Sequence, residues 1–297
     1  MAEAFYIPAL NAEHLAEAVA WALPRIACEL RADVLAALRD SEQKETTARA
    51  QTAIQMLLEN ARIAAADQVP LCQDTGTVWV FLEAGSAANG KPLAIPADIF
   101  SLIDPTVHWV WQEKALRNSL LSDALLDRQN TNSNTPAFTE LVLRPSLSGV
   151  RLTVMLKGGG SDNASRLEML NPSDGWPAIH QLVLETVLQK AANACPPLVI
   201  GVAVGSTFDK VAALAKQALI RPLWQENPNP HLAELETELL TAINQTGIGP
   251  AGLGGETTAL AVHLVTAACH LAALPVAVNL GCSAMRSVTL ELTGEWA

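Results

Sequence analysis

Apolar positions near the start of the chain recur at the spacing of helices. Over residues 11–26 one face collects Leu15, Ala18, Val19 and Ala22. This is the i, i+3, i+4, i+7 pattern of an amphipathic helix, and Asn11 is a suitable N-cap for it. A second apolar stripe follows, at Ile54, Leu57, Leu58 and Ala61. The pattern therefore predicts a helical N-terminal segment over residues 1–66.

Apolar runs typical of strands appear after residue 76. Residues 77–82 and 275–280 are short and apolar, and 198–205 is a continuous apolar run suited to a strand buried on both faces. Residues 150–156 alternate apolar and polar side chains with the period of two that marks a strand with one buried face. Residues 140–144 form another expected strand, which could pair with 150–156 as a hairpin.

Helical patterns separate these strands. We expect helices at residues 97–126, 175–194, 209–220, 232–243 and 259–268. Strands that alternate with helices favour a mixed α/β fold. The prediction is one domain over residues 1–297, with a mixed sheet flanked by helices and the helical N-terminal segment packed on it.

Composition excludes some classes of function. The chain has 297 residues, half of them hydrophobic, and a net charge of −11. No basic patch rises above this acidic background, so a nucleic-acid partner is not expected. No apolar run reaches the roughly 20 residues of a membrane span, and the first five residues do not resemble a signal peptide. We therefore expect a cytoplasmic protein whose five cysteines remain thiols.

Two polar stretches interrupt the pattern. Residues 72–76, Cys-Gln-Asp-Thr-Gly, place a thiol, an amide, a carboxylate and a hydroxyl just before the first expected strand. Such a segment forms either a turn with a small buried cysteine or a site. Residues 128–136 are almost continuously polar, so they form an exposed loop or a loop that lines a ligand.

Two glycine-rich stretches could approach an anion. Residues 157–163, Lys-Gly-Gly-Gly-Ser-Asp-Asn, follow the strand at 150–156, and successive glycines there permit positive φ and exposed backbone amides. Residues 247–258 contain five glycines and precede the helix expected at 259–268, as in anion sites at helix N-termini. A glycine triplet on its own is also typical of a flexible turn.

Three of the five cysteines share one context. Cys72, Cys195 and Cys282 each lie at the edge of an expected strand beside proline or glycine, whereas Cys28 and Cys269 lie in alanine-rich helical surroundings. The separations of 123 and 87 residues exclude zinc ribbons and ferredoxin-type motifs. The residues alone leave two alternatives open, three unrelated thiols or one metal site that the fold gathers.

Seven segments, in order, resemble the iron–sulfur hydro-lyase family of class I fumarases and L-tartrate dehydratases. They are Cys-Gln-Asp-Thr-Gly at 72–76, Leu-Arg-Asn-Ser at 116–119, Asn-Thr-Asn-Ser-Asn-Thr-Pro at 130–136, Lys-Gly-Gly-Gly-Ser-Asp-Asn at 157–163, Ala-Cys-Pro-Pro at 194–197, Gly-Ile-Gly-Pro-Ala-Gly-Leu-Gly-Gly-Glu-Thr-Thr at 247–258 and Pro-Val-Ala-Val-Asn-Leu-Gly-Cys at 275–282. The resemblance extends from about residue 45 to residue 290.

The resemblance implies a [4Fe–4S] cluster held by Cys72, Cys195 and Cys282. Three protein thiolates leave one iron open, and an open iron can act as a Lewis acid that assists the loss or addition of water. Zinc bound to the same thiols is an alternative.

The resemblance also implies roles for five other residues. Gln73 and Gly159 are similar to family residues that bind substrate, and Arg117 is similar to one that binds a carboxylate through the two-pronged guanidinium. Asp74 and His270 are similar to residues that take part in the proton-transfer chemistry of the family.

Two departures qualify the resemblance. The family commonly has Trp after the third cysteine and then a basic pair, where this chain has Ser283 and the sequence Met285-Arg286-Ser287. Single-chain members also continue into a second domain, so a chain that ends at Ala297 resembles the α subunit of the two-subunit form. A β subunit would then complete the active site, in an oligomer of α–β pairs.

The expected reaction is the reversible hydration of a C4 dicarboxylate, fumarate, to L-malate. L-Tartrate dehydration is the second possibility and mesaconate hydration the third. The alternative from another class is a non-catalytic subunit that binds the cluster or a dicarboxylate without turnover.

Overall fold

The computed structural model describes residues 2–87 and 90–294. Its residues form two compact units. Unit 1 comprises the described residues of Met1–Arg31, Ala64–Lys157 and Arg286–Ala297, and unit 2 comprises Ala32–Ile63 and Gly158–Met285. A single domain over residues 1–297 stays a prediction.

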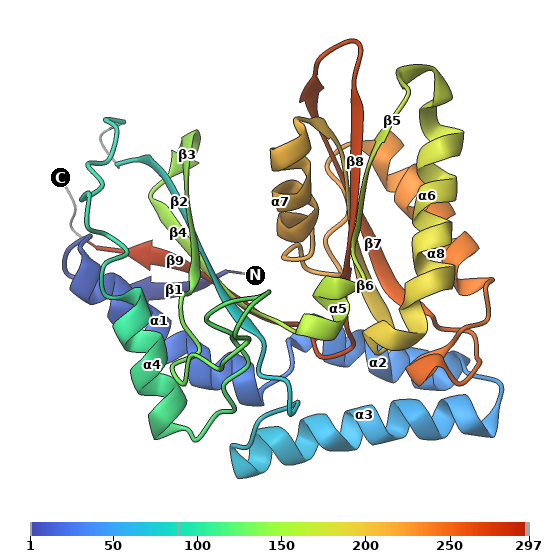
Figure 1. Ribbon diagram of the computed structural model, residues 1–297, viewed down its shortest axis with the longest axis horizontal. Helices are drawn as coiled ribbons and strands as arrows, with labels where there is room; N and C mark the ends of the chain where they lie inside the picture. The colour runs from blue at the N-terminus through green and yellow to red at the C-terminus, as the bar shows by residue number, and fades with distance from the viewer. Residues whose placement is uncertain (1, 88–89, 295–297) are drawn as a thin grey trace. The chain divides into compact units, whose positions relative to one another are not determined.

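Unit 1 is built on a five-stranded mixed sheet with the order β1-β9-β4-β2-β3 (Figure 1). The strands are β1 (Glu3–Tyr6), β2 (Thr77–Ser86), β3 (Phe138–Ser148), β4 (Val150–Lys157) and β9 (Arg286–Thr293). β4 runs antiparallel to β2 and β9, whereas the β2–β3 and β1–β9 pairs are parallel. Two helices, α1 (Ala12–Cys28) and α4 (Ile103–Glu113), pack on the sheet through one shared core.

The core of unit 1 follows from the alternation of its strands. Val78, Val80 and Leu82 of β2 point to the same face and are fully buried against α1 and α4. Asn11 caps α1 as the sequence predicts, because its Oδ1 accepts a 2.9 Å hydrogen bond from the amide of His14. The unit thus has one face packed by helices.

The expected hairpin at 140–156 is wrong, although both of its strands exist. β2 lies between β3 and β4 in the sheet. Gly149 joins β3 to β4 across the end of β2, with its amide donating to Ser86 O at 2.8 Å and its carbonyl accepting from Gly85 N at 3.0 Å. Its φ of +86° lies in the left-handed region that favours glycine.

Unit 2 contains a four-stranded mixed sheet with the order β5-β8-β6-β7. Its strands are β5 (Arg166–Leu170), β6 (Leu198–Ser206), β7 (Ala259–Cys269) and β8 (Leu274–Gly281). Only the β6–β7 pair is parallel. Its helices are α2 (Ala32–Lys44), most of α3 (Ala48–Asp67), α5 (Gly159–Asn163), α6 (Gly175–Lys190), α7 (Phe208–Ala218) and α8 (Pro230–Asn244), with short 3₁₀ turns η1 (Pro172–Asp174), η2 (Ala191–Ala194) and η3 (Pro250–Gly252).

The sheet of unit 2 is covered on both faces. α6 and α8 share a core with one face of β6, β7 and β8, and α7 packs on the other (Figure 1). This explains the continuous apolar run of β6, as predicted for a strand buried on both faces. A Cβ on Gly201 of β6 would lie 2.1 Å from Ala215 O, so α7 approaches this strand as closely as it does because residue 201 is glycine.

The α/β class and the helical N-terminal segment are confirmed, with two sheets rather than one. The helix expected at 259–268 is wrong, because this alanine-rich segment pairs with β6 as strand β7. The helix expected at 97–126 is confirmed only over the eleven residues of α4. The sequence patterns also missed β1, β5 and β9.

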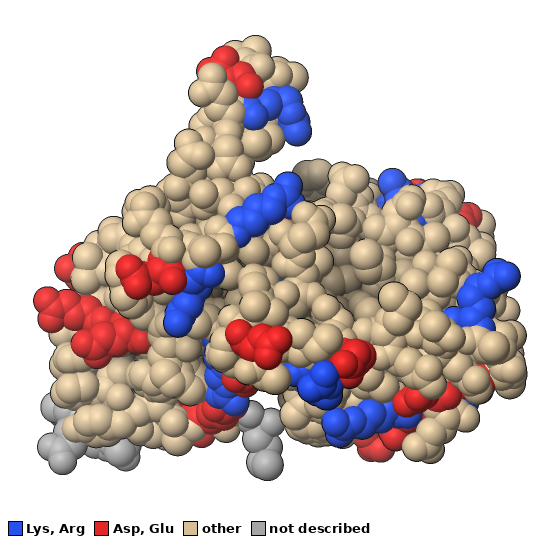
Figure 2. All heavy atoms as spheres, turned by 90° about the horizontal axis from the view of Figure 1, so that it is seen from below, with Lys and Arg blue, Asp and Glu red and all other residues tan. Residues whose placement is uncertain are grey.

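Helix hydropathy and surface charge bear on what the chain can bind. Over the described residues, no helix combines the length and the hydropathy needed to cross a membrane. Acidic and basic side chains are interspersed on the face shown in Figure 2.

Candidate functional site

Three of the seven sequence segments meet within unit 1. Thr75 Oγ1 donates to Arg117 O at 2.5 Å and lies 3.2 Å from Ser119 Oγ. Asn134 Oδ1 accepts from Ser119 N at 2.7 Å, and Asn134 Nδ2 donates to Gly76 O at 3.1 Å. We call the group of residues 72–76, 117–119 and 134 the unit 1 loop site.

Gln73 and Arg117 form a direct pair in this loop site. Arg117 Nη1 donates to Gln73 Oε1 at 2.6 Å. The Arg117 side chain is exposed, and no described carboxylate forms an ion pair with it. A guanidinium that is oriented by a neutral amide keeps its charge and its other donors for an anionic ligand.

Asp74 is held through both its side chain and its backbone. Its Oδ1 accepts from Gly76 N at 2.9 Å, which closes a tight turn. Its carbonyl oxygen accepts from Arg286 Nη1 at 2.8 Å. Arg286 is only 1% exposed, and its buried Nε has no hydrogen-bond partner among the described residues. Arg286, the first residue of β9, thus holds the backbone of the segment that contains Cys72, Gln73 and Asp74.

Cys195 and Cys282 come together at one end of the unit 2 sheet. Cys195 precedes β6 and Cys282 follows β8, two strands that pair with Val199 opposite Gly281. Ser283 N donates to Cys195 O at 3.0 Å, so the two cysteine segments are in backbone contact. We call this edge of the sheet the unit 2 cysteine end.

Both glycine-rich segments lie at the unit 2 cysteine end. Residues 247–258 lead into β7, whose first residue pairs with the first residue of β6. Ala251 N donates to Pro196 O at 2.9 Å, one residue after Cys195. Because this segment precedes a strand, the anion site expected at a helix N-terminus is wrong here.

Gly159 begins the short helix α5, which packs against β8 and against η2, the turn that precedes Cys195. The expected use of positive φ is not seen at the start of this segment, since Gly158 has a φ of −65°. Four of the seven sequence segments, at 157–163 apart from Lys157, 194–197, 247–258 and 275–282, therefore gather in unit 2. The other three gather in unit 1.

The structure does not bring His270 to the cysteine end. It lies in the turn after β7, where Cys269 pairs with Ser206 at the opposite end of the sheet. The eleven residues of β7 span about 33 Å at about 3.3 Å per residue. His270 is exposed, and its Nδ1 accepts from Ala272 N at 3.1 Å. Its catalytic role stays a prediction.

The five cysteines differ in their suitability as metal ligands. Cys195 is exposed and Cys72 and Cys282 are half-buried, so a cofactor could reach each of these side chains. Cys28 lies in the core of unit 1, and burial raises the pKa of its thiol, which disfavours the thiolate that a metal needs. Cys269 donates to Ala273 O at 3.3 Å, at the end of β7 that is far from Cys195.

The three candidate ligands are divided among the units. Cys72 belongs to unit 1, whereas Cys195 and Cys282 belong to unit 2. Within residues 2–87 and 90–294, no three His, Cys, Asp or Glu side chains gather closely enough to hold a metal ion. The donor chemistry and the access to the three sulfurs fit an iron–sulfur cluster.

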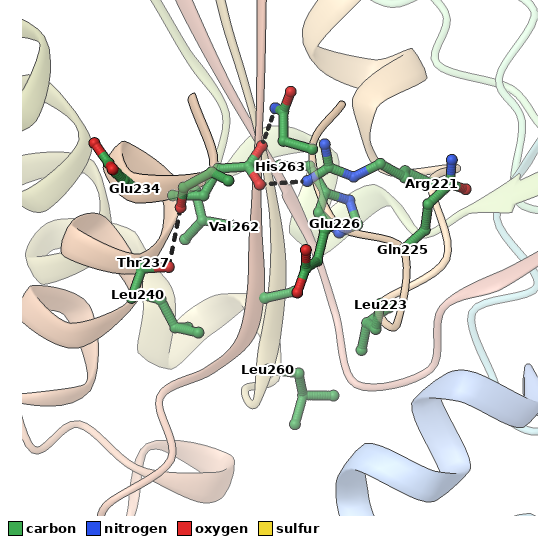
Figure 3. A pocket seen from close by; sticks show the side chains of 14 residues that line it. Arg221, Leu223, Gln225, Glu226, Glu234, Thr237, Leu240, Leu260, Val262 and His263 are labelled. Carbon is green, nitrogen blue, oxygen red and sulfur yellow. Dashed lines mark hydrogen bonds and ion pairs between the residues drawn. The ribbon is translucent and has the colours of Figure 1, made fainter. Parts of the chain in front are cut away.

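Unit 2 also has a cavity of about 540 Å³ that none of the predicted site residues lines. Its walls come from the edge strand β7, from α8 and from the loop at 221–227, with Arg221, Glu234 and His263 among the lining residues (Figure 3). Glu236 accepts hydrogen bonds there from Arg221 Nη2 at 2.6 Å, from Asn227 Nδ2 at 2.7 Å and from the backbone amide of Leu264 at 2.6 Å. The carboxylate thus satisfies an open backbone donor of the edge strand.

Sequence patterns missed three residues that position the loop site, namely Thr75, Asn134 and Arg286. The first two were visible only as members of polar stretches, and both are at most 1% exposed. Arg286 was visible as a lone basic residue four positions after Cys282. A polar side chain inside a motif is thus a signal of a buried hydrogen-bonding role as much as of contact with a ligand.

Comparison with known proteins shows the family of the chain. A family model described as fumarate hydratase (Fumerase) matches residues 16–291. A putative L(+)-tartrate dehydratase subunit alpha of Methanocaldococcus jannaschii is 38% identical over 257 residues, which cover 86% of this chain and 89% of that protein. The L(+)-tartrate dehydratase subunit alpha of Escherichia coli (strain K12) is 31% identical over 278 residues, which cover 93% and 90%.

These matches and the two groups of polar and thiol residues define an enzyme of the hydro-lyase class. Such an enzyme adds water to a substrate or removes it. The match to the family model runs through nearly all of both units. The chain belongs to the fumarate hydratase family.

Proposed function

We propose that the chain is the α subunit of a hydro-lyase that hydrates fumarate reversibly to L-malate. The observation that carries the proposal is the Gln73–Arg117 pair, with its 2.6 Å hydrogen bond and its exposed guanidinium. A planar guanidinium binds a carboxylate through two parallel hydrogen bonds, which suits a dicarboxylate substrate. Gln73 orients the guanidinium without neutralising it.

Cys72, Cys195 and Cys282 are the proposed ligands of a [4Fe–4S] cluster. When bound, such a cluster supplies a Lewis-acidic iron that polarises a hydroxyl or carboxylate oxygen. Gly159 is proposed to donate its backbone amide to a substrate carboxylate. Asp74 is proposed to exchange a proton with the substrate, and its carbonyl contact with Arg286 limits how far its backbone can move.

The relatives named above are called alpha subunits, and we infer a β-subunit partner that completes the active site. The proposed assembly is an oligomer of α–β pairs. His270 is proposed to act in proton transfer in that assembly. A reducing cytoplasm is the proposed location, because it keeps the ligand thiols reduced.

L-Tartrate is the second candidate substrate, favoured by the names of these relatives. It is a C4 dicarboxylate like malate and carries one more hydroxyl group. The α–β complex should be purified without oxygen, its cluster rebuilt, and fumarate, L-tartrate and mesaconate supplied in parallel. Conversion of fumarate with the highest kcat/KM supports the proposal, whereas a higher kcat/KM for L-tartrate replaces fumarate with the second candidate.

An Arg117→Met variant of the same complex tests whether the guanidinium of the Gln73–Arg117 pair binds a substrate carboxylate. Loss of a charge-assisted pair to a substrate carboxylate should lower kcat/KM by about 10- to 100-fold. Arg128→Met is the matched control, because Arg128 is an exposed arginine eleven residues away whose Nη1 contacts Ala124 O at 2.7 Å. Equal activity of the two variants would contradict the role of Arg117. No turnover of any of the three substrates by the complex would favour a non-catalytic subunit.

A further inference from the structure

An ion pair between a buried lysine and a partly exposed aspartate lies within unit 2, close to the glycine segment. Lys216 Nζ of α7 lies 3.1 Å from Asp162 Oδ1 and 3.3 Å from Asp162 Oδ2 in α5. The Lys216 side chain is 9% exposed, whereas that of Asp162 is 39% exposed. Asn279 Nδ2 of β8 donates to the same carboxylate at 3.3 Å. One carboxylate therefore ties three elements of the unit together.

The arrangement does not maximise stability. Burial lowers the pKa of Lys216, because the charged ammonium loses water, and Asp162 only opposes this effect. Asn279 uses its donor on Asp162, and its buried Oδ1 has no partner among the described residues. A buried acceptor without a donor costs about 1–3 kcal/mol. A network that costs stability in two places is more typical of a functional constraint than of core packing.

The Lys216–Asp162–Asn279 network lies beside the predicted substrate-binding and cysteine segments. Asp162 lies three residues after Gly159, and Asn279 lies three residues before Cys282. α5 also packs against η2, the turn that leads to Cys195. α5 has only five residues, and its glycines offer little side-chain packing to hold it. The ion pair is therefore a polar attachment that joins this short helix to α7.

We infer that Lys216 is a positioning residue for the reaction. It fixes Asp162, and through Asp162 it sets the orientation of α5 and of the Gly159 amide beside β8, the strand that ends just before Cys282. The inference rests on the proposed function, which assigns the Gly159 amide to a substrate carboxylate. Lys216 itself is not proposed to touch substrate or cofactor.

The kinetic test uses Lys216→Met in the complete α–β complex with its cluster rebuilt. A misoriented amide weakens the binding of substrate, so KM should rise at least about tenfold while the iron content of the complex stays at the wild-type value. Lys210→Met is the matched control, because Lys210 is an exposed lysine on the same helix. Lys216→Arg keeps the charge and should recover part of the loss in KM. An unchanged KM in Lys216→Met, or an equal rise in the control, overturns the inference.

Hydrogen exchange tests the same inference without any substrate. In Lys216→Met the amides of residues 159–163 should exchange at least about tenfold faster, while those of α7 keep the wild-type rates. Loosening of α7 as well, or no change in α5, would show that Lys216 is only structural and would overturn the inference. If the wild-type complex converts no substrate but α5 loosens as expected, the proposed function fails and the positioning contact stands.

The double variant Asp162→Asn/Lys216→Met separates position from stability. Replacing both charges removes the buried unpaired ammonium that Asp162→Asn alone would leave, so the unfolding temperature should return close to that of the wild type. KM should stay raised, because the attachment of α5 is still absent. Recovery of both the unfolding temperature and KM would contradict the inference.

Discussion

Asn134 connects the three segments of the unit 1 loop site, and its replacement by Ala tests how that site is held. The side chain is 0% exposed, and both of its polar atoms are used, on Ser119 N at 2.7 Å and on Gly76 O at 3.1 Å. Asn134→Ala leaves a buried donor and a buried acceptor, which costs about 1–3 kcal/mol for each group. Asn134 also has a φ of +55°, where Ala costs about 1–2 kcal/mol.

The expected loss in the free energy of unfolding is therefore about 3–8 kcal/mol, a large part of the roughly 5–15 kcal/mol of an ordinary protein. Equilibrium urea unfolding, followed by far-ultraviolet circular dichroism, measures this loss. Asn134→Gly separates its two causes, since glycine accepts the positive φ but still loses both hydrogen bonds. It should recover only about 1 kcal/mol.

Asn132→Ala is the matched control. Asn132 lies in the same loop with a φ of +57°, but its side chain is exposed. This variant should lose only the backbone cost of about 1–2 kcal/mol. A loss in Asn134→Ala no larger than that in Asn132→Ala would refute the argument that buried hydrogen bonds of Asn134 hold the loop site.

Three further predictions concern other parts of the chain. Serine at any one of the proposed ligands should abolish cluster binding, measured as iron and sulfide per chain, whereas serine at Cys28 or Cys269 should leave it near the wild-type value. Gly249→Ala should strongly destabilise the 247–258 segment, because its Cβ would lie 2.2 Å from the Gly254 carbonyl carbon, whereas Gly247→Ala has open space and costs only about 1–2 kcal/mol in thermal unfolding. The free energy of unfolding should rise with pH between the lowered pKa of Lys216 in the folded chain and about 10.5, its ordinary value. In that range the unfolded chain keeps a proton on Lys216 that the folded chain has lost. The free energy of unfolding, measured at a series of pH values, should rise less in Lys216→Met.

Local patterns predicted the elements that are set by local chemistry. α1 shows its buried face and its N-cap in the sequence, and β6 shows its burial on both faces. The sequence of β7 predicts a helix because alanine and leucine favour helices, and only its pairing with β6 decides otherwise. Likewise, nothing in the spacing of β2, β3 and β4 indicates that β2 lies in the middle.

The sequence predicts which residues belong to the candidate site, but it does not predict which of them contact one another. The three thiols, Gln73 and Arg117 are each expected from the resemblance, and their roles stay predictions. The direct contact between Gln73 and Arg117 is not predicted by the sequence. The contacts of Asn134 with residues 15 and 58 positions away depend on the fold and leave no periodic signal. The placement of His270 at the far end of β7 was hidden for the same reason, because the segment before it was assigned to a helix.

The central claim is that three thiolates hold an iron–sulfur cluster with one open iron. Anaerobic crystals of the α–β complex, measured by anomalous diffraction at the iron absorption edge, test it most directly. We expect one compact iron signal with the sulfurs of Cys72, Cys195 and Cys282 each about 2.3 Å from an iron, taking the zinc–thiolate length as a guide. Zinc at these sulfurs, or a cluster that is not bound by all three, would contradict it.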